Sequence, residues 1–115
     1  MYVSVRGESV RHAGFASLAE GMKVIGLDAF EMAVDAEMGV APVEGDWDQR
    51  MRLDTPAAVV LFREQLARRG LRVSALLLAN DFSRPELDAE VDWVVRCAEL
   101  ADTLGADALR IDAVM

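Results

Sequence analysis

Apolar side chains recur at helical spacing in three separate stretches of the chain. The clearest stretch opens with the capping box Ser83-Arg84-Pro85-Glu86 and stops before Gly105, where a helix-ending glycine belongs. Its apolar residues form two adjacent rows, the first being Leu87, Val91, Val94, Val95 and Ala98 and the second Trp93, Cys97, Leu100 and Leu104. So wide an apolar arc predicts a helix that packs on a sheet between other helices.

Two further helices are predicted earlier in the chain. One starts with Thr55-Pro56 as N-cap and first helical residue and stops at Gly70. Its core-facing residues at helical spacing are Val59, Phe62 and Leu66. The other is capped by Ser17 and stops at Gly26, although Gly21 within it costs about 1 kcal/mol relative to alanine.

Four short apolar stretches alternate with these helices, at residues 2–5, 29–34, 73–79 and 108–114. The last two are nearly continuous hydrophobic runs, which is typical of strands buried on both faces. Each of the last three follows the same junction of a glycine, an apolar residue and a charged residue: Gly26-Leu27-Asp28, Gly70-Leu71-Arg72 and Gly105-Ala106-Asp107. This repeat of four strands and three helices predicts an α/β fold with right-handed crossovers and a parallel sheet.

One connection, at residues 35–54, is much longer than the others. It joins the second strand to the second helix and carries glycine, proline and Trp47 among acidic residues. Such a loop follows the carboxyl end of a strand, where α/β proteins bind ligands. Loops of this length are commonly functional, so we weigh a lid over a binding site equally against a variable surface insertion.

Charged residues inside two of the strands favour one architecture over another. Glu31 interrupts the second strand and Arg110 the fourth, and alternation places Glu31, Ala33 and Asp35 on one face. A doubly wound sheet would bury these charges under helices at a cost of several kcal/mol. A barrel tolerates them because its interior opens onto a ligand pocket. We therefore predict a single incomplete domain over residues 1–115, the amino-terminal half of a TIM (β/α)8 barrel.

Composition narrows the class of protein. The chain has 115 residues, 53% hydrophobic and 28% charged, which is the composition of a folded domain. The net charge of −8 argues against nucleic-acid binding, although local arginines can still attract a small anion within a Debye length of about 8–10 Å. No apolar run is long enough to span a membrane, no secretory signal is recognised, and the lone Cys97 suits a reducing compartment. We expect a cytoplasmic protein without membrane partners.

Three segments resemble one superfamily, the xylose-isomerase-like TIM barrels of the sugar phosphate isomerase/epimerase class. Segment 25–32 (IGLDAFEM) is similar to the start of the second strand of these barrels. Segment 62–76 (FREQLARRGLRVSAL) looks like their second helix and third strand, and segment 98–111 (AELADTLGADALRI) like their third helix and fourth strand. The resemblance consists mainly of the repeated order of helix, glycine and strand. Glu31 and Arg110 are its more distinctive residues.

The resemblance implies a metal-dependent isomerase or epimerase of carbohydrate metabolism, acting on a sugar, a sugar derivative or a cyclitol. In that family a divalent metal (Mn, Mg, Co or Zn) polarises substrate oxygens while carboxylates move protons at an adjacent carbon. The family's metal ligands come from later strands, so no residue of this chain is assigned to the metal. We expect the metal in the complete barrel only.

Six residues are candidates for contact with substrate, and each has a structural alternative. Glu31 and Arg110 either reach into the pocket or pair with each other. Arg110 can also neutralise Asp112. One more candidate directly follows the third strand, one lies beside Arg110 in the fourth, and two lie in loops. In that order these four are Asn80, Asp112, His12 and Trp47.

The alternatives for the loop candidates are plain. Asn80 precedes Asp81-Phe82-Ser83, which is equally a turn leading to a helix cap. His12 has the right intrinsic pKa for a general base, but a lone loop histidine is more often solvated. Trp47 either stacks on a sugar ring or anchors the long loop. We expect the catalytic residues themselves outside this chain.

Four strands cannot close a barrel, so we expect a fragment that is inactive alone and associates with the missing half. One alternative is another enzyme on the same scaffold, such as a dehydratase or a lyase. Another is a non-catalytic half-barrel that binds a ligand as a homodimer.

Overall fold

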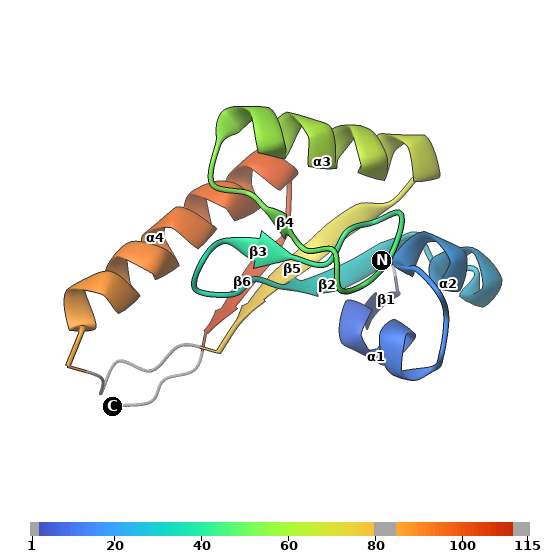
Figure 1. Cartoon of the computed structure of the whole chain (residues 1–115), viewed down its shortest axis with the longest axis horizontal. Helices are drawn as coiled ribbons and strands as arrows, with labels where there is room; N and C mark the ends of the chain where they lie inside the picture. Colours follow the sequence, from blue (N-terminus) through green and yellow to red (C-terminus); the bar gives the residue numbers. More distant parts are fainter. Residues whose placement is uncertain (1–2, 80–84, 112–115) are drawn as a thin grey trace.

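The structure, a computed structural model, describes residues 3–79 and 85–111. It is built on a parallel sheet of four strands (Figure 1). Its strands lie in the order β1-β2-β5-β6, and every neighbouring pair is parallel. They are β1 (Ser4–Arg6), β2 (Ala29–Ala33), β5 (Arg72–Leu78) and β6 (Ala108–Ile111). The predicted α/β class with a parallel four-stranded sheet is therefore confirmed. β2 and β6 begin where predicted, and the end of β1, the end of β2 and both ends of β5 differ from the prediction by one residue. The predicted start of the first strand and end of the fourth lie outside the described residues.

Four helices accompany the sheet in the described residues, one more than predicted: α1 (Gly7–His12), α2 (Leu18–Ile25), α3 (Pro56–Arg69) and α4 (Leu87–Leu104). The additional helix, α1, follows β1 directly and ends at His12, which the sequence had placed in a loop. Within these ranges no helix is long and apolar enough to cross a membrane.

Local signals set most helix ends. The Ser17 hydroxyl accepts a hydrogen bond from the Glu20 amide at 3.1 Å, and the Thr55 hydroxyl accepts one from the Ala58 amide at 3.2 Å. The glycines that follow α2, α3 and α4 all take the left-handed conformation, for example Gly26 at φ 83°. These helix ends were predicted correctly because the signals act over only three or four residues.

The start of α4 differs from the prediction. Glu86 occupies the N-cap without a side-chain capping bond, and Pro85 precedes the helix instead of opening it. Ser83, the predicted cap, lies outside the described residues. The first of the two predicted apolar rows does not face the core, because Leu87, Val91 and Val95 are 45–49% exposed. The core is instead contacted by the second row, with Trp93, Cys97 and Leu100 buried.

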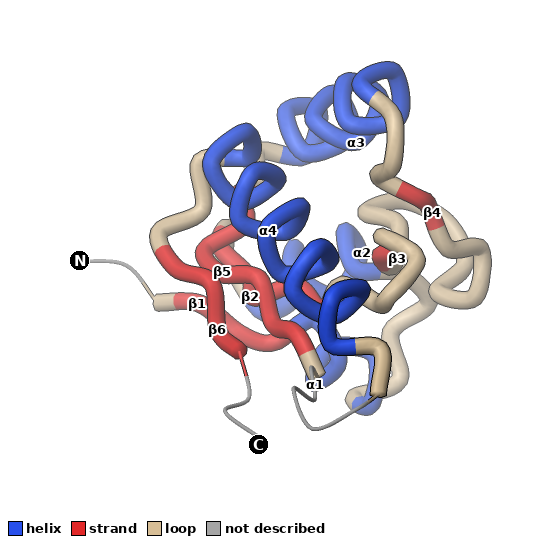
Figure 2. The backbone as a smooth tube through the Cα atoms, turned by 90° about the vertical axis from the view of Figure 1, so that its left-hand side faces the viewer, coloured by secondary structure: helices blue, strands red, loops and turns tan. Residues whose placement is uncertain are grey.

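The core lies on one side of the sheet. Outward-pointing strand residues such as Phe30, Met32 and Leu76 join one hydrophobic cluster with side chains from all four helices. Figure 2 shows the strands on one side of the molecule and the segment that carries β3 and β4 on the other, with α4 between them. The opposite face of the sheet carries Glu31, Ala33 and Arg110, and none of these joins the cluster.

The long connection at residues 35–54 belongs to this core. It contains a short antiparallel pair, β3 (Gly39–Val40) with β4 (Met51–Arg52). Its buried apolar residues are Met38, Val40, Val43, Trp47 and Leu53. We call residues 35–54 the insertion. Because it packs with the helices, it does not lie as a lid over the face that carries Glu31.

Asp35 fixes the start of the insertion. Its carboxylate accepts hydrogen bonds from the amides of Gly39 at 2.7 Å and Glu37 at 2.9 Å, and it pairs with Arg50 at 3.2 Å. Desolvation raises the pKa of Asp35, but these hydrogen bonds and the Arg50 charge outweigh it, so the pKa lies below its ordinary value. The sequence had placed Asp35 on the Glu31 face by alternation. That placement was wrong because β2 ends at Ala33, before alternation reaches Asp35.

Asp35→Asn is expected to lower the free energy of unfolding by about 1 kcal/mol at pH 7, a modest value because the carboxylate is 45% exposed. The folded-state pKa is lowered, so this contribution is present above the ordinary value of 3.8 and is lost as pH falls through the lower folded value. Urea unfolding of both proteins from pH 7 to pH 2.5 measures it. Asp92→Asn, at an exposed position of α4, is the control. A difference in unfolding free energy between the two proteins that stayed constant down to pH 2.5 would contradict a stabilising role of the ionised Asp35 carboxylate.

Candidate functional site

Glu31 lies at the centre of the face of the sheet that the core does not cover. Its Oε1 lies 3.1 Å from the Arg110 Nη2 atom, and its Oε2 lies 3.6 Å from the Arg6 Nε atom. Arg6 belongs to β1 and Arg110 to β6, which are the two outer strands of the sheet. One carboxylate from β2 therefore joins side chains from both edges of the sheet.

Strand register explains why these three side chains meet. Arg6 is paired with Glu31 across β1 and β2, so both side chains point to the same face. Arg110 is paired with Leu77 of β5, which is paired in turn with Ala33, two residues beyond Glu31. The Arg110 side chain thus crosses β5 to reach Glu31. This is possible because the β5 residue opposite Glu31 is the small Ala75.

A β-bulge puts Ala75 in that position. The register between β2 and β5 shifts after Phe30, so that Phe30 pairs with Val73 but Glu31 pairs with Ala75. Ser74 is the extra residue, and it is buried at 4% exposure. Bulges of this kind redirect side chains and are common beside functional sites.

The three charged residues differ in burial. The Glu31 side chain is 13% exposed, whereas those of Arg6 and Arg110 are 63% and 59% exposed. Glu31 is thus held between two guanidinium groups whose outer N–H donors face solvent. One carboxylate against two arginines leaves this cluster with a net charge of +1 on a chain whose total is −8.

A hollow of about 670 Å³ opens on the same face. Arg6 and Arg110 line it together with small and aliphatic residues, among them Ala33, Leu77 and Ala79. Its volume falls in the range of small-molecule sites. We call Arg6, Glu31, Arg110 and this hollow the arginine site. It can present guanidinium donors to a carboxylate or phosphate, and the edge of the Glu31 carboxylate to a hydroxyl group.

The structure brings together only two of the residues predicted from the sequence to contact a ligand, Glu31 and Arg110. The remaining partner, Arg6, was not among the candidates, because the first strand was predicted to end at Val5 whereas β1 extends through Arg6. Strand alternation with the correct end would have placed Arg6 beside Glu31. Asn80 and Asp112 lie outside the described residues.

The two loop candidates lie away from the arginine site. His12 is an exposed residue at the end of α1. Trp47 is buried at 8% exposure, and its indole N–H donates a hydrogen bond to the Phe15 carbonyl oxygen at 2.8 Å. Trp47 therefore anchors the insertion to the loop between α1 and α2, and its ring is not free to stack on a sugar.

Residues suited to hold a metal ion are not clustered in ranges 3–79 and 85–111, where no group of three or more His, Cys, Asp or Glu side chains converges. Glu31, the carboxylate of the arginine site, has a guanidinium group beside each of its oxygens. The residues of this site consequently do not fit a divalent metal, and no metal-dependent step is assigned to them.

Cys97 does not supply a reactive thiol. It is fully buried in α4, and its Sγ atom lies 3.8 Å from the Met38 Sδ atom. Desolvation raises its pKa to about 11, so the thiolate is not populated at neutral pH. The arginine site is thus the only cluster of charged residues from separate strands that the described residues place over a hollow. Neither a protein-family model, nor a curated protein, nor a solved structure matches this chain.

Proposed function

We propose that this chain forms half of a TIM-type barrel enzyme, an isomerase or epimerase acting on a sugar or sugar phosphate, and that the arginine site binds the substrate. The single observation that carries this proposal is the position of Glu31 between Arg6 and Arg110, on the uncovered face of a parallel sheet. In barrels of this class the uncovered face is the interior, and ligands bind where it opens at the carboxyl ends of the strands.

The half-barrel part of the proposal is supported by the one-sided core. The helices and the insertion cover the other face, so the face that carries Arg6, Glu31 and Arg110 stays open, as the interior face of a barrel strand does. Small residues on this face, such as Ala33 and Ala75, leave room above the sheet. The resemblance of segments 25–32, 62–76 and 98–111 to the xylose-isomerase-like barrels points the same way.

In this proposal each charged residue has a distinct role. Arg6 and Arg110 bind a phosphate or carboxylate group of the substrate through the N–H donors that face solvent. Glu31 holds both guanidinium groups in place and accepts a hydrogen bond from a substrate hydroxyl. The divalent metal and the carboxylates that move protons belong to the complementary half of the barrel, so this chain alone turns over no sugar.

One observation favours a second candidate, a non-catalytic half-barrel that acts as a homodimer. In the described residues β1 and β6 have no outer neighbour. Val3, just before β1, and Ile111, the last residue of β6, are 67% and 44% exposed. A second copy would cover these edges. Sedimentation velocity distinguishes this candidate, which requires a species of twice the chain mass of 12.6 kDa. A chain that stays monomeric at high concentration would eliminate it.

Ribose 5-phosphate and ribose test substrate binding by the arginine site, with binding followed by NMR titration of the labelled chain. The phosphorylated sugar is expected to bind at least about tenfold more tightly, because a charge-assisted hydrogen bond contributes on the order of 1.5–3 kcal/mol. Arg110→Gln should weaken ribose 5-phosphate binding by about tenfold. Glu31→Gln should instead tighten binding of inorganic phosphate, because it removes the competing carboxylate.

Arg52→Gln is the matched control, since Arg52 is a 64% exposed arginine that pairs with Asp54 in the insertion, away from the arginine site. It should leave both affinities unchanged within about twofold. Equal weakening by Arg52→Gln and Arg110→Gln would refute the assigned site. Turnover of a sugar by the isolated chain would refute the division of labour between the two halves.

A further inference from the structure

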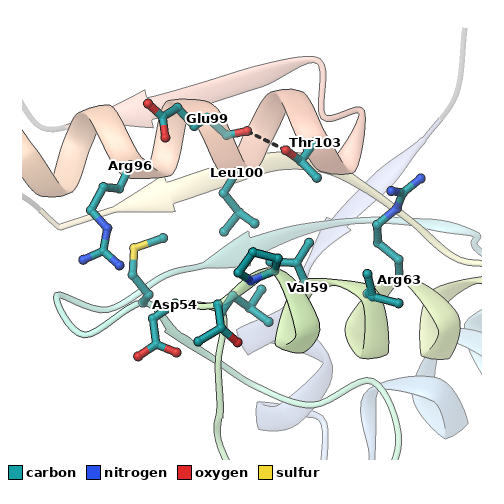
Figure 3. Close-up of a pocket in the computed structure, with 12 residues that line it drawn as sticks. Asp54, Val59, Arg63, Arg96, Glu99, Leu100 and Thr103 are labelled. Carbon is teal, nitrogen blue, oxygen red and sulfur yellow. Dashed lines mark hydrogen bonds between the residues drawn. The ribbon is translucent and has the colours of Figure 1, made fainter.

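A second pocket lies on the helix-covered side of the sheet, between the start of α3 and the second half of α4 (Figure 3). Its volume is about 380 Å³, within the range of small-molecule sites. The floor is apolar and is formed by Met38 and Leu53 of the insertion with Val59 of α3 and Leu100 of α4. We call it the helix pocket. It is separate from the arginine site, which lies on the opposite face of the sheet.

Two arginines stand at the ends of the helix pocket. Figure 3 shows Arg96 of α4 at one end and Arg63 of α3 at the other, with Leu100 and Val59 between them. Within residues 3–79 and 85–111, neither Arg63 nor Arg96 has a carboxylate within ion-pair distance. Lys23 on α2 is the only other lysine or arginine of these ranges that has no carboxylate within ion-pair distance. Two of three unpaired cations therefore line one pocket.

This placement is unusual for so acidic a chain. Twenty Asp and Glu residues face twelve Lys and Arg residues, and most described arginines are paired with one of these carboxylates. The two acidic residues at the helix pocket do not neutralise its arginines. Asp54 pairs with Arg52 at 3.1 Å, and the Glu99 carboxylate points away from Val59 in Figure 3. The pocket therefore joins an apolar floor to local positive charge.

We propose that the helix pocket binds a small amphipathic carboxylate, a molecule with an apolar body and one acid group. The apolar body lies on Leu53, Val59 and Leu100, where it removes apolar surface from water. The acid group lies at one end of the pocket, where the guanidinium group of Arg63 or of Arg96 donates to it, and the other arginine attracts it over a longer distance. Overall negative charge repels free anions, so affinity for this ligand depends on the two rim arginines.

Decanoate and decanol are the probes, because they share a ten-carbon body and differ in the charged group. Binding is followed by ¹H–¹³C methyl spectra of the whole chain, with decanoate kept below its micelle concentration. Decanoate is expected to bind with a Kd in about the millimolar range or tighter, with shifts concentrated at the methyl groups of Leu53, Val59 and Leu100. Decanol is expected to bind at least about fivefold more weakly.

Single variants locate the charge requirement. Arg63→Gln and Arg96→Gln should each raise the Kd for decanoate by about threefold or more, and the double variant by about tenfold, while decanol binding stays unchanged. Both arginines lie at exposed positions, so neither substitution disturbs the core. Lys23→Gln removes the third unpaired cation, away from the pocket, and should change the Kd by less than about twofold.

Three outcomes would overturn the proposal. One is decanol binding as tightly as decanoate, and another is an unchanged Kd in the double variant. The last is a set of shifts at Leu77 and Leu109, which line the hollow of the arginine site, without shifts at Leu100. Loss of sugar phosphate binding in Arg110→Gln has no bearing on this result, so the two sites are tested independently.

Discussion

Trp47→Ala is expected to lower the free energy of unfolding by about 3–5 kcal/mol, the usual cost of removing a buried tryptophan side chain. The ring is 8% exposed and belongs to the cluster that joins the insertion to the helices and the sheet. The substitution leaves a cavity and also leaves the Phe15 carbonyl oxygen without its 2.8 Å hydrogen bond. Equilibrium unfolding in urea, followed by far-UV circular dichroism, measures the loss.

Trp47→Phe separates the two contributions. Phenylalanine retains most of the apolar contact but cannot donate to the Phe15 carbonyl, so a smaller loss of about 1–2 kcal/mol is expected. A loss below about 1 kcal/mol for Trp47→Ala would show that the insertion is not part of the core. It would also reopen a role for Trp47 at a ligand.

Gly21→Ala is expected to lower the free energy of unfolding by about 1–3 kcal/mol, the cost of overpacking. In an exposed helix the same change would raise it by roughly 0.5–1 kcal/mol, because glycine is the poorer helix former. Gly21 is buried in α2, and a Cβ atom there would lie 2.9 Å from the Phe15 Cδ2 atom and nearer still to the Val10 Cγ1 atom. The close approach of α1 and α2 thus requires glycine.

Lys23→Ala is the matched control for Gly21→Ala, because Lys23 is an exposed residue of the same helix. It should change stability by less than about 0.5 kcal/mol. Stabilisation by Gly21→Ala would mean that α1 does not pack against α2 as described. The change in urea midpoint at constant slope provides the measurement.

The need for glycine at position 21 is not visible in the sequence. In the sequence, Gly21 only lowers the predicted stability of a short helix, because helix propensity describes an isolated helix without its neighbours. The structure adds Val10 of α1 as a neighbour, and α1 was not predicted. Its six residues are too few to show a helical period, so only packing against α2 and β2 reveals it.

The apolar pattern of α4 was ambiguous for a related reason. Both rows, one with Leu87 and Val91 and the other with Trp93 and Cys97, fit helical spacing equally well. The structure buries the second row, which contacts Met38 of the insertion and the sheet. Which row is buried depends on residues more than 50 positions away in the chain, so the apolar period of the helix alone could not predict it.

The arginine site was predicted in part. Glu31 and Arg110 were identified because a charge inside an apolar strand run is conspicuous in sequence. Arg6 was not, because it is the last residue of a three-residue strand whose end was predicted one position too early. The bulge at Ser74 could not be predicted either, since it exists only in the register between β2 and β5.

By itself the sequence determined the α/β class, the parallel order of strands and most helix ends, because caps, terminal glycines and apolar periods act within a few residues. Only the tertiary structure decided which face of α4 is buried, that the insertion joins the core, and that Arg6 and Arg110 meet at Glu31. Each of these depends on contacts between segments distant in the chain. Such contacts depend on how all the elements pack together and which charges pair, and a local sequence pattern does not predict either.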